Sequence, residues 1–177
     1  MSTPELPDDE RSTRAVIPHW APLLYWPVGF LLVHIALPWG LSLLSPRYGW
    51  VEGRPGWFNL SSLLLVVAGI AGAIWTMVLH YIQAPEGWEL ERTPKYLLSR
   101  GPYKFTRNPM FLAELVLWLG WVLFYGSIAV LAGFSLFWVA MNFLAVPREE
   151  RDLEARFGEA YRQYKSKVPR WLGKPRN

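Results

Sequence analysis

The sequence contains no cysteine among its 177 residues. This absence excludes disulfides, thiolate metal sites and a cysteine nucleophile. Histidine is also scarce, since the chain has only His19, His34 and His80, and these are far apart in the sequence. Their positions show none of the spacings that are typical of metal ligands. We therefore expect no metal centre in this protein.

Charged residues are missing from three long stretches. Residues 22–44 and 60–82 contain no Asp, Glu, Lys or Arg, and residues 110–146 contain only Glu114. A helix needs roughly 20 apolar residues to cross the hydrocarbon core of a bilayer. A soluble helical protein with buried core helices is the alternative, but three such stretches in so short a chain argue against it.

The third stretch is too long for one span and about right for two short ones, with Gly126 and Ser127 placed to form the turn. The sequence therefore predicts an all-α fold, an integral membrane bundle of four transmembrane helices. The expected spans lie at about residues 22–44, 60–82, 110–125 and 128–146.

The cations are distributed unevenly between the two sides of such a bundle. Four spans place both termini on one side, and sixteen of the 18 Lys and Arg residues then fall on that side, against Arg47 and Arg54 on the other. This asymmetry predicts a multi-pass protein with cytoplasmic N- and C-termini. Basic flanks beside anionic membrane lipid account for the high pI. No nucleic-acid partner is expected, because the chain has no basic groove-reading motif.

The two terminal segments differ in character. Residues 1–17 are polar and acidic, so we expect a disordered cytoplasmic tail rather than a signal peptide. Residues 18–177 then form a single membrane domain. Its last part, about residues 148–166, predicts an amphipathic cytoplasmic helix that lies on the membrane or covers the mouth of the bundle. The apolar face of this helix recurs at helical spacing: Leu153, Phe157, Tyr161, Tyr164 and Val168.

A polar turn leads into the third span. Gly101-Pro102 marks the turn, and Pro109 suits the first turn of a helix. Tyr103, Arg107 and Asn108 then lie beside the free N–H groups of a helix start, which favour an anionic ligand group. A helix cap with an arginine that reaches the interface explains the same residues.

Three carboxylates lie at or within the predicted membrane region. Glu149 and Glu150 adjoin the last span, where paired carboxylates are costly unless they meet a cation or a ligand. Glu114 is the one charge within residues 110–146, which makes it a candidate functional group. An ion pair of Glu114 with Arg107 or Arg100 is the structural alternative.

Together these motifs resemble a known enzyme family. The quoted residues are Gly101-Pro102-Tyr103, Arg107-Asn108-Pro109-Met110-Phe111, and Glu149-Glu150 followed by Leu153, Phe157-Gly158, Tyr161, Tyr164 and Val168-Pro169-Arg170. They resemble the isoprenylcysteine carboxyl methyltransferase family, which includes membrane phospholipid and thiol methyltransferases. The resemblance covers about residues 97–171, with the motifs in the right order on either side of one helical hairpin.

The resemblance implies a small helical membrane enzyme that binds S-adenosyl-L-methionine at its cytoplasmic face. The implied cofactor-binding residues are Lys95, Tyr96, Leu97, Leu98, Tyr103, Asn108, Pro109, Met110, Phe111, Glu149 and Glu150. Glu114 and Glu150 are the candidate bases for an acceptor that must lose a proton. Arg107 and Arg148 are candidates to hold an acidic acceptor or the cofactor carboxylate.

Three positions depart from the family pattern. Asn108 stands where His is usual, Phe111 where Tyr is usual, and Ala113 where Gly is usual. Asparagine donates and accepts hydrogen bonds but cannot take up a proton. Position 108 is therefore not expected to transfer a proton, and the substrate can differ from that of family members with the usual residues.

We expect the cofactor to enter from the cytoplasm and a lipophilic small-molecule acceptor to enter sideways from the bilayer. A carboxylate, thiol, amine or hydroxyl acceptor is compatible with the sequence. Two other functions remain open. A membrane reductase of the sterol and steroid type has a similar C-terminal hairpin and uses NADPH, and a small non-catalytic membrane scaffold would have no cofactor site.

Overall fold

The structure is a computed structural model that describes residues 27–83 and 96–173. The predicted tail over residues 1–17 and the candidate cofactor residue Lys95 lie outside the described residues. Most of the described chain is helical, in agreement with the helical class that the sequence predicts. The elements in chain order are η2 (Leu32–Ala36), α2 (Leu37–Ser42), β1 (Trp50–Val51), β2 (Arg54–Pro55), α3 (Trp57–Ser61), α4 (Leu63–Gln83), η3 (Gly101–Lys104), α5 (Pro109–Tyr125), α6 (Ile128–Ala140), η4 (Met141–Ala145), α7 (Val146–Phe157) and α8 (Glu159–Lys167).

Within the described residues two helices are long and apolar enough to cross a membrane, Trp57–Ile82 and Ile128–Phe157. Two shorter apolar helices, Pro27–Ser42 and Pro109–Tyr125, accompany them. Large apolar side chains such as Leu64 on α4 and Leu136 on α6 point outward and are more than 70% exposed. Exposed apolar surface of this kind on long helices is what contact with lipid requires.

Small residues let α4 and α5 approach closely. A Cβ atom added to Gly69 would lie 2.5 Å from the Cβ of Leu117, and one added to Gly72 would lie 3.0 Å from the Cβ of Ala113. Small residues three or four positions apart have this close-packing role in membrane helices. The close approach also gives the methyl group of Ala113, which replaces the usual glycine, a place opposite a glycine of the neighbouring helix.

Two π-helical segments each precede a proline. In η2 the N–H of Leu37 donates to the carbonyl of Leu32, one residue before Pro38. In η4 the N–H of Val146 donates to Met141, one residue before Pro147. Proline has no N–H and disturbs a regular helix. The wider π turn lets the helix continue through it.

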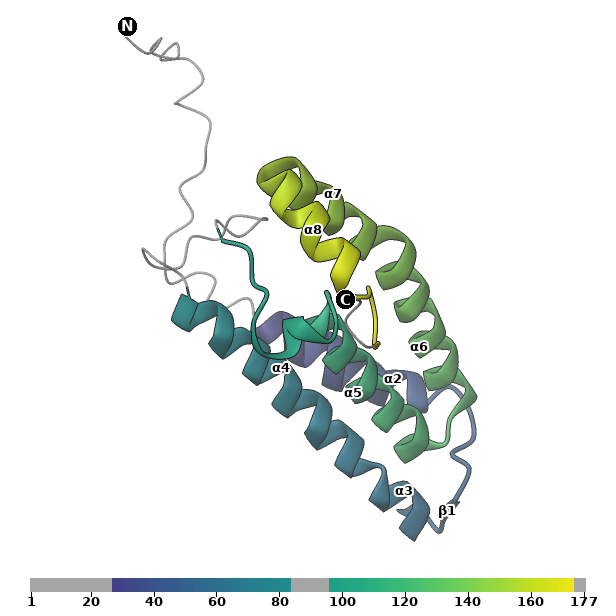
Figure 1. The fold of residues 1–177 in the computed structure, drawn as a ribbon. Coiled ribbons are helices and arrows are strands. Elements are labelled where there is room, and N and C mark those ends of the chain that lie inside the picture. Colours follow the sequence, from purple (N-terminus) through teal and green to yellow (C-terminus); the bar gives the residue numbers. More distant parts are fainter. Residues whose placement is uncertain (1–26, 84–95, 174–177) are drawn as a thin grey trace, which may run out of the picture.

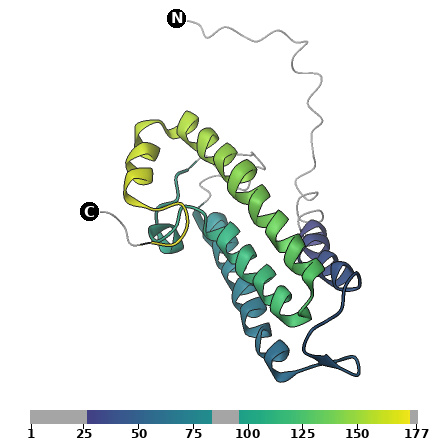
Figure 2. The same cartoon turned by 90° about the vertical axis from the view of Figure 1, so that its right-hand side faces the viewer.

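The last apolar helix therefore does not end where the sequence predicts a boundary, between residues 146 and 148. Helices α6, η4 and α7 form one continuous rod (Figures 1 and 2). The break comes later, at Gly158, whose φ of 52° is unfavourable for residues with a side chain. The C-terminal helix expected over residues 148–166 is thus divided into α7 and α8.

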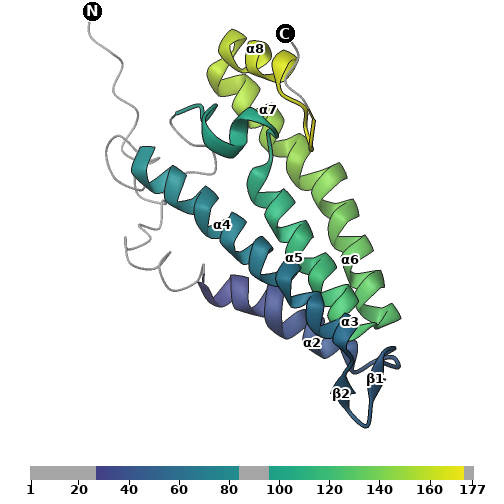
Figure 3. The ribbon, with the colours of Figure 1, turned by 60° about the horizontal axis from the view of Figure 1, so that its bottom comes forward.

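The bundle has two dissimilar ends. Helices α7 and α8 and the η3 turn lie at one end, and the β1–β2 hairpin lies at the other (Figures 1 and 3). The hairpin pairs Trp50 with Pro55 in antiparallel register, a small strand pair that the all-α prediction did not include. The turn between α5 and α6 at Gly126 and Ser127, predicted from the sequence, lies at the hairpin end, where the N–H of Tyr48 donates to the carbonyl of Gly126.

Candidate functional site

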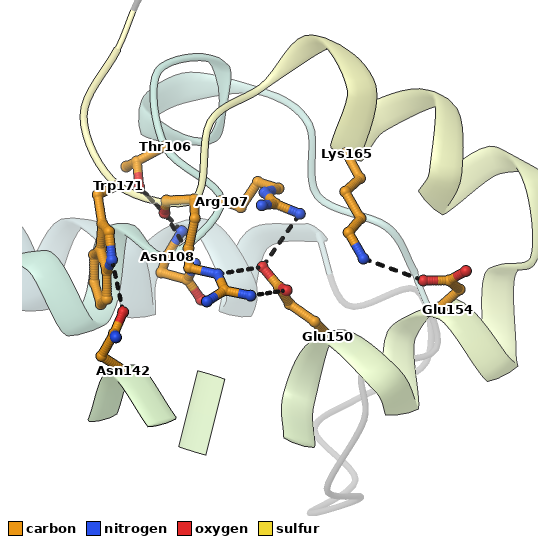
Figure 4. Close-up of polar contacts among 9 residues, drawn as sticks. Thr106, Arg107, Asn108, Asn142, Glu150, Glu154, Lys165 and Trp171 are labelled. Carbon is orange, nitrogen blue, oxygen red and sulfur yellow. Dashed lines mark hydrogen bonds and ion pairs between the residues drawn. The ribbon is translucent and has the colours of Figure 1, made fainter. Parts of the chain in front are cut away.

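The η3 turn and the start of α5 are fastened to the C-terminal segment. The backbone N–H of Arg107 donates to the carbonyl of Pro169 over 3.0 Å. The Oγ1 of Thr106 and the Nδ2 of Asn108 both donate to the carbonyl of Arg170, each at 3.0 Å (Figure 4). The two motifs that the sequence separates by a helical hairpin therefore meet in space.

Glu150 joins these segments by charge. Its Oε2 lies 2.7 Å from Nη2 of Arg170, and its Oε1 lies 3.2 Å from Nη1 of Arg107 (Figure 4). Glu150 is 5% exposed and the side chain of Arg107 is 9% exposed. A buried carboxylate needs such partners to offset its desolvation. Two guanidinium groups around one carboxylate leave this cluster with an excess of positive charge.

Arg107 retains hydrogen-bonding capacity. Its Nε and Nη1 atoms are buried, and neither has an aligned hydrogen-bond acceptor among the described residues. The 3.2 Å contact of Nη1 with Glu150 is thus an ion pair in which the N–H does not point along the bond. The phenol of Tyr161 is also close enough to this guanidinium for the charge of Arg107 to affect its pKa. A buried guanidinium whose Nε and Nη1 lack aligned acceptors is suited to a carboxylate group of a ligand.

A chain of aromatic hydroxyl groups lies beside the cluster. The hydroxyl of Tyr164 donates to the carbonyl of Tyr103 over 2.8 Å, and the Tyr103 hydroxyl lies 2.7 Å from Nε2 of His80. Tyr96 donates to the carbonyl of His80 at 2.7 Å. Burial, and after it the charge of Glu149, raises the pKa of Tyr103, so its phenol stays neutral.

The other predicted cofactor residues lie just before η3 and in the first turns of α5 and α7. Leu98 and Pro109 are buried, and Glu149 is close enough to Tyr103 to affect its pKa. Four more are half-buried: Tyr96, Leu97, Met110 and Phe111. Arg148, a candidate for holding an acidic group, is exposed on α7.

Glu114 does not belong to this cluster. Its Oε1 lies 3.9 Å from Nε2 of His34, which comes from η2. Arg107 is paired with Glu150 instead, so within the described residues the ion pair of Glu114 with Arg107 or Arg100 is not formed. The two candidate bases thus have different surroundings, because Glu150 is held between two arginines and Glu114 faces a histidine.

Sequence reasoning missed several residues of the site. Arg170 ends the quoted C-terminal motif, but its pairing with Glu150 depends on how the chain returns to α7. Asn142, whose Oδ1 accepts from Nε1 of Trp171 over 3.1 Å, lies in η4 without a motif of its own. His80 was detectable as a polar residue in the last turn of the second span, next to the motif loop in space.

The residues at this end fit S-adenosyl-L-methionine in chemical type. The buried Arg107 offers donors for the carboxylate of the cofactor. Burial, and after it the charges of Glu150 and Asp152, raises the pKa of Glu149, so a positive amino or sulfonium group beside it would favour its charged form. The buried Leu98 offers an apolar neighbour for the flat base. A separate open cavity of about 560 Å³ lies at the hairpin end, lined by residues that include Trp57, Asn59 and Ile128. None of the predicted site residues lines that cavity.

The model of the phospholipid methyltransferase family matches residues 59–160. This is more than half of the chain, which therefore belongs to that family of methyltransferases, and the resemblance drawn from the motifs is confirmed. The matched segment runs from the middle of α3 to the start of α8, so it includes the η3 turn, the α5–α6 hairpin and Glu150.

Two relatives of known sequence are similar to the chain. An uncharacterized protein of Haemophilus influenzae is 41% identical over 63 residues, which are 36% of this chain and 100% of that protein. Methanethiol S-methyltransferase 1 of Bradyrhizobium diazoefficiens is 36% identical over 81 residues, which are 44% of this chain but only 26% of that enzyme. No solved structure is significantly similar to the chain.

Proposed function

We propose that the protein is an integral membrane methyltransferase that uses S-adenosyl-L-methionine. The observation that supports this most is the buried cluster of Arg107, Glu150 and Arg170, which unites both family motifs in one place. The cofactor would bind between the η3 turn, the start of α5 and the start of α7. It supplies an electrophilic methyl group when bound.

The protein would cross the membrane four times. The two long apolar helices, together with the two shorter ones over Pro27–Ser42 and Pro109–Tyr125, provide the spans. The end that carries α7 and α8 would face the cytoplasm, because it holds the excess of cations. The β1–β2 hairpin, with Arg47 and Arg54, would face the other side.

The residues of the cluster would have distinct roles. Arg107 would bind the carboxylate of the cofactor through its buried donors, and Glu149 would stabilise the positive end. Glu150 would position Arg107 and the C-terminal segment rather than accept a proton, because two guanidinium groups already neutralise it. Asn108 would be structural, because its amide donates to the carbonyl of Arg170.

The acceptor would be a lipophilic or small membrane-accessible molecule. Among carboxylate, thiol, amine and hydroxyl acceptors, the similarity to a methanethiol S-methyltransferase favours a thiol. Methyl transfer is an in-line displacement, in which holding the two reactants in position lowers the barrier by several kcal/mol or more.

Calorimetric titration of the purified full-length protein in detergent micelles tests the cofactor. We expect S-adenosyl-L-methionine to bind and Arg107→Ala to weaken binding at least tenfold. Arg162→Ala, which removes an exposed arginine of α8, is the matched control and should leave the affinity unchanged. Binding of NADPH alone would indicate a reductase, and binding of neither ligand would support a scaffold.

A labelled-methyl transfer assay on membrane extracts tests the activity. Extracts from cells with and without the protein are supplied with methyl-labelled cofactor, and the labelled product is identified by mass. A product that depends on the protein and is lost in Arg107→Ala is the expected result.

A further inference from the structure

A second polar cluster lies inside the bundle, away from Arg107 and Glu150. His34 on η2 is 5% exposed, and its Nε2 lies 3.9 Å from Oε1 of Glu114 on α5. Glu114 follows Asn108 by six residues, which places it about 9 Å further along the helix axis. His34 also lies in a π-helical segment, a distortion that is frequent at functional sites.

Three nitrogen atoms of this cluster are buried without a hydrogen-bond partner among the described residues. They are Nδ1 and Nε2 of His34 and Nε1 of Trp118, which is 1% exposed. A buried polar group without a partner costs free energy, and most such groups in folded proteins are satisfied. The imidazole of His34 lies beside the carboxylate of Glu114, and Trp118 follows Glu114 by about one turn of α5, so this region can take up a polar group of a ligand.

Aromatic rings form the walls around this cluster. Phe30 stacks on His34 with ring centroids 4.4 Å apart, and Phe137 meets His34 edge-on at 5.8 Å. Phe137 also stacks on Trp118 at 5.4 Å. Among the described residues His34 thus contacts two aromatic rings, the carboxylate of Glu114 and the indole N–H of Trp121, which donates to the His34 carbonyl over 2.6 Å. Such a site suits a lipophilic molecule with a single small polar head.

We propose that His34 and Glu114 form the binding site for the methyl acceptor, and that the acceptor is a lipophilic thiol or alcohol whose proton His34 removes. This proposal rests on the proposed methyltransferase function. The acceptor would lie on the membrane side of the cofactor, and α5 would line both sites, with Asn108 at one and Glu114 at the other.

The reaction balances with these groups. An electron pair of the acceptor sulfur or oxygen forms the bond to the methyl carbon. The bond between that carbon and the sulfonium sulfur breaks, and its electron pair stays on the sulfur. The proton of the acceptor goes to Nδ1 of His34. The carboxylate of Glu114, on the Nε2 side, stabilises the imidazolium that results.

Charge determines which acceptors this site accepts. A carboxylate acceptor would lie beside the carboxylate of Glu114 in an apolar region, where like charges repel strongly. A thiol or a hydroxyl is uncharged when it enters, and it finds a proton acceptor in His34 and a donor in Nε1 of Trp118. The site therefore selects neutral acceptors that have a proton to lose.

Binding can be measured without the cofactor. In full-length protein labelled with ¹⁵N-tryptophan, the indole N–H signal of Trp118, assigned with Trp118→Phe, should shift when decane-1-thiol is added. We expect His34→Phe to weaken this binding at least tenfold and His34→Gln to change it less than threefold, because Gln keeps hydrogen-bonding groups. Phe143→Leu, at an exposed position of η4, should bind like wild type.

The proton-transfer role is tested by comparing two thiols with the same variants. His34→Gln should slow methylation of decane-1-thiol about 100-fold, within the usual range for loss of a general base. It should slow methylation of 4-butylthiophenol less, by tenfold or under, at mildly acidic pH, because this more acidic thiol still enters uncharged there but gives up its proton more readily without a base. Wild type and His34→Gln should bind S-adenosylhomocysteine with the same affinity.

Three outcomes would overturn the proposal: an unshifted Trp118 signal, equal slowing of the two thiols by His34→Gln, or methylation of fatty acids in preference to decane-1-thiol and decan-1-ol. Failure of the underlying function would differ from these. Wild type would then bind no adenosyl ligand and transfer no methyl group, whereas the Trp118 signal would still report whether the thiol binds.

Discussion

The two ends of α5 are both closed by an asparagine, but they differ in charge. At the C-terminal end Nδ2 of Asn59 lies within 3.1 Å of three carbonyl oxygens, those of Tyr48, Leu123 and Phe124. At the N-terminal end Nδ2 of Asn108 donates to one carbonyl, next to the buried ion pairs of Glu150. At the first end a neutral amide hydrogen-bonds the backbone carbonyls, whereas the second end also contains buried ion pairs.

This difference separates stability from ligand binding. At the hairpin end these three carbonyls are satisfied, and the guanidinium group of Arg47 lies 4.8 Å over the ring of Trp50. The other end keeps donors of Arg107 without aligned acceptors among the described residues. Because the guanidinium of Arg107 is not fully hydrogen-bonded within the fold, a charged cofactor would bind at this end.

The largest expected effect is that of removing the carboxylate from the charged end. Glu150→Ala leaves Arg107 buried without its partner, which should lower the free energy of unfolding by about 3–5 kcal/mol and abolish cofactor binding. Chemical unfolding in micelles and calorimetric titration measure the two effects. Glu154→Ala removes a half-exposed partner of Arg162 and Lys165, and it should match wild type in both stability and affinity. Similar losses of stability and affinity in Glu150→Ala and Glu154→Ala would contradict a special role for the buried carboxylate.

Replacing the two asparagines should separate the two ends directly. Asn59→Ala removes the amide donor from the carbonyls of Tyr48 and Leu123, whereas the carbonyl of Phe124 keeps Nε1 of Trp50. It should cost roughly 1–3 kcal/mol of unfolding free energy, with the affinity for S-adenosyl-L-methionine unchanged. Asn108→Ala removes one hydrogen bond, worth about 1 kcal/mol, and should also lower the affinity for S-adenosyl-L-methionine. An effect of Asn59→Ala on cofactor affinity would show that the ends are coupled.

Between its ends α5 is held by packing. Gly69→Ala puts a methyl group 2.5 Å from the Cβ of Leu117, so we expect a loss of about 1–2 kcal/mol from overpacking. Gly40→Ala is the matched control, because no atom lies within 4 Å of its added Cβ in helix α2. It should stabilise the protein by roughly 0.5–1 kcal/mol. The same sign for both substitutions in thermal unfolding would argue against the close α4–α5 contact.

The smallest effect at neutral pH concerns Tyr161, which packs at the charged end. Burial, and after it the charge of Glu150, raises its pKa from 10.0 to about 12. A raised pKa in the folded state means that the neutral phenol adds stability below pH 10, and that this stability is lost as the pH rises toward 12. The free energy of unfolding, measured between pH 10 and pH 12, should fall less steeply with pH in Tyr161→Phe than in wild type. An identical pH dependence in both proteins would contradict the assignment.

Charge-free stretches predicted the helices because a span needs length and apolarity, and both can be read from the sequence. Pro109 and Gly126 likewise indicate where α5 begins and ends, through their own backbone preferences. The β1–β2 hairpin was not predictable in this way, because two-residue strands leave no alternating pattern. The passage of α6 into α7 through Pro147 was also missed, since it depends on a π turn that has no sequence signature.

Much of the candidate site follows from the motifs, but its partners do not. Glu150 was singled out because two adjacent carboxylates near a bilayer need a cation, and Arg107 is that cation. The second arginine, Arg170, comes from a segment 20 residues further along the chain. His34 has no motif and meets Glu114 only because η2 packs against α5. Contacts between distant segments of this kind depend on the packed fold.

The rod that joins α6 to α7 has a mechanical consequence. Its 30 residues extend about 45 Å, whereas the hydrocarbon core of a bilayer is about 30 Å thick. Under the proposed topology the surplus emerges on the cytoplasmic side and bears Glu149 and Glu150. A thinner or thicker bilayer changes the tilt of such a rod, and with it the height of these carboxylates above the lipid headgroups. The lipid composition of the host membrane would therefore determine how far Glu149 and Glu150 stand from the lipid headgroups.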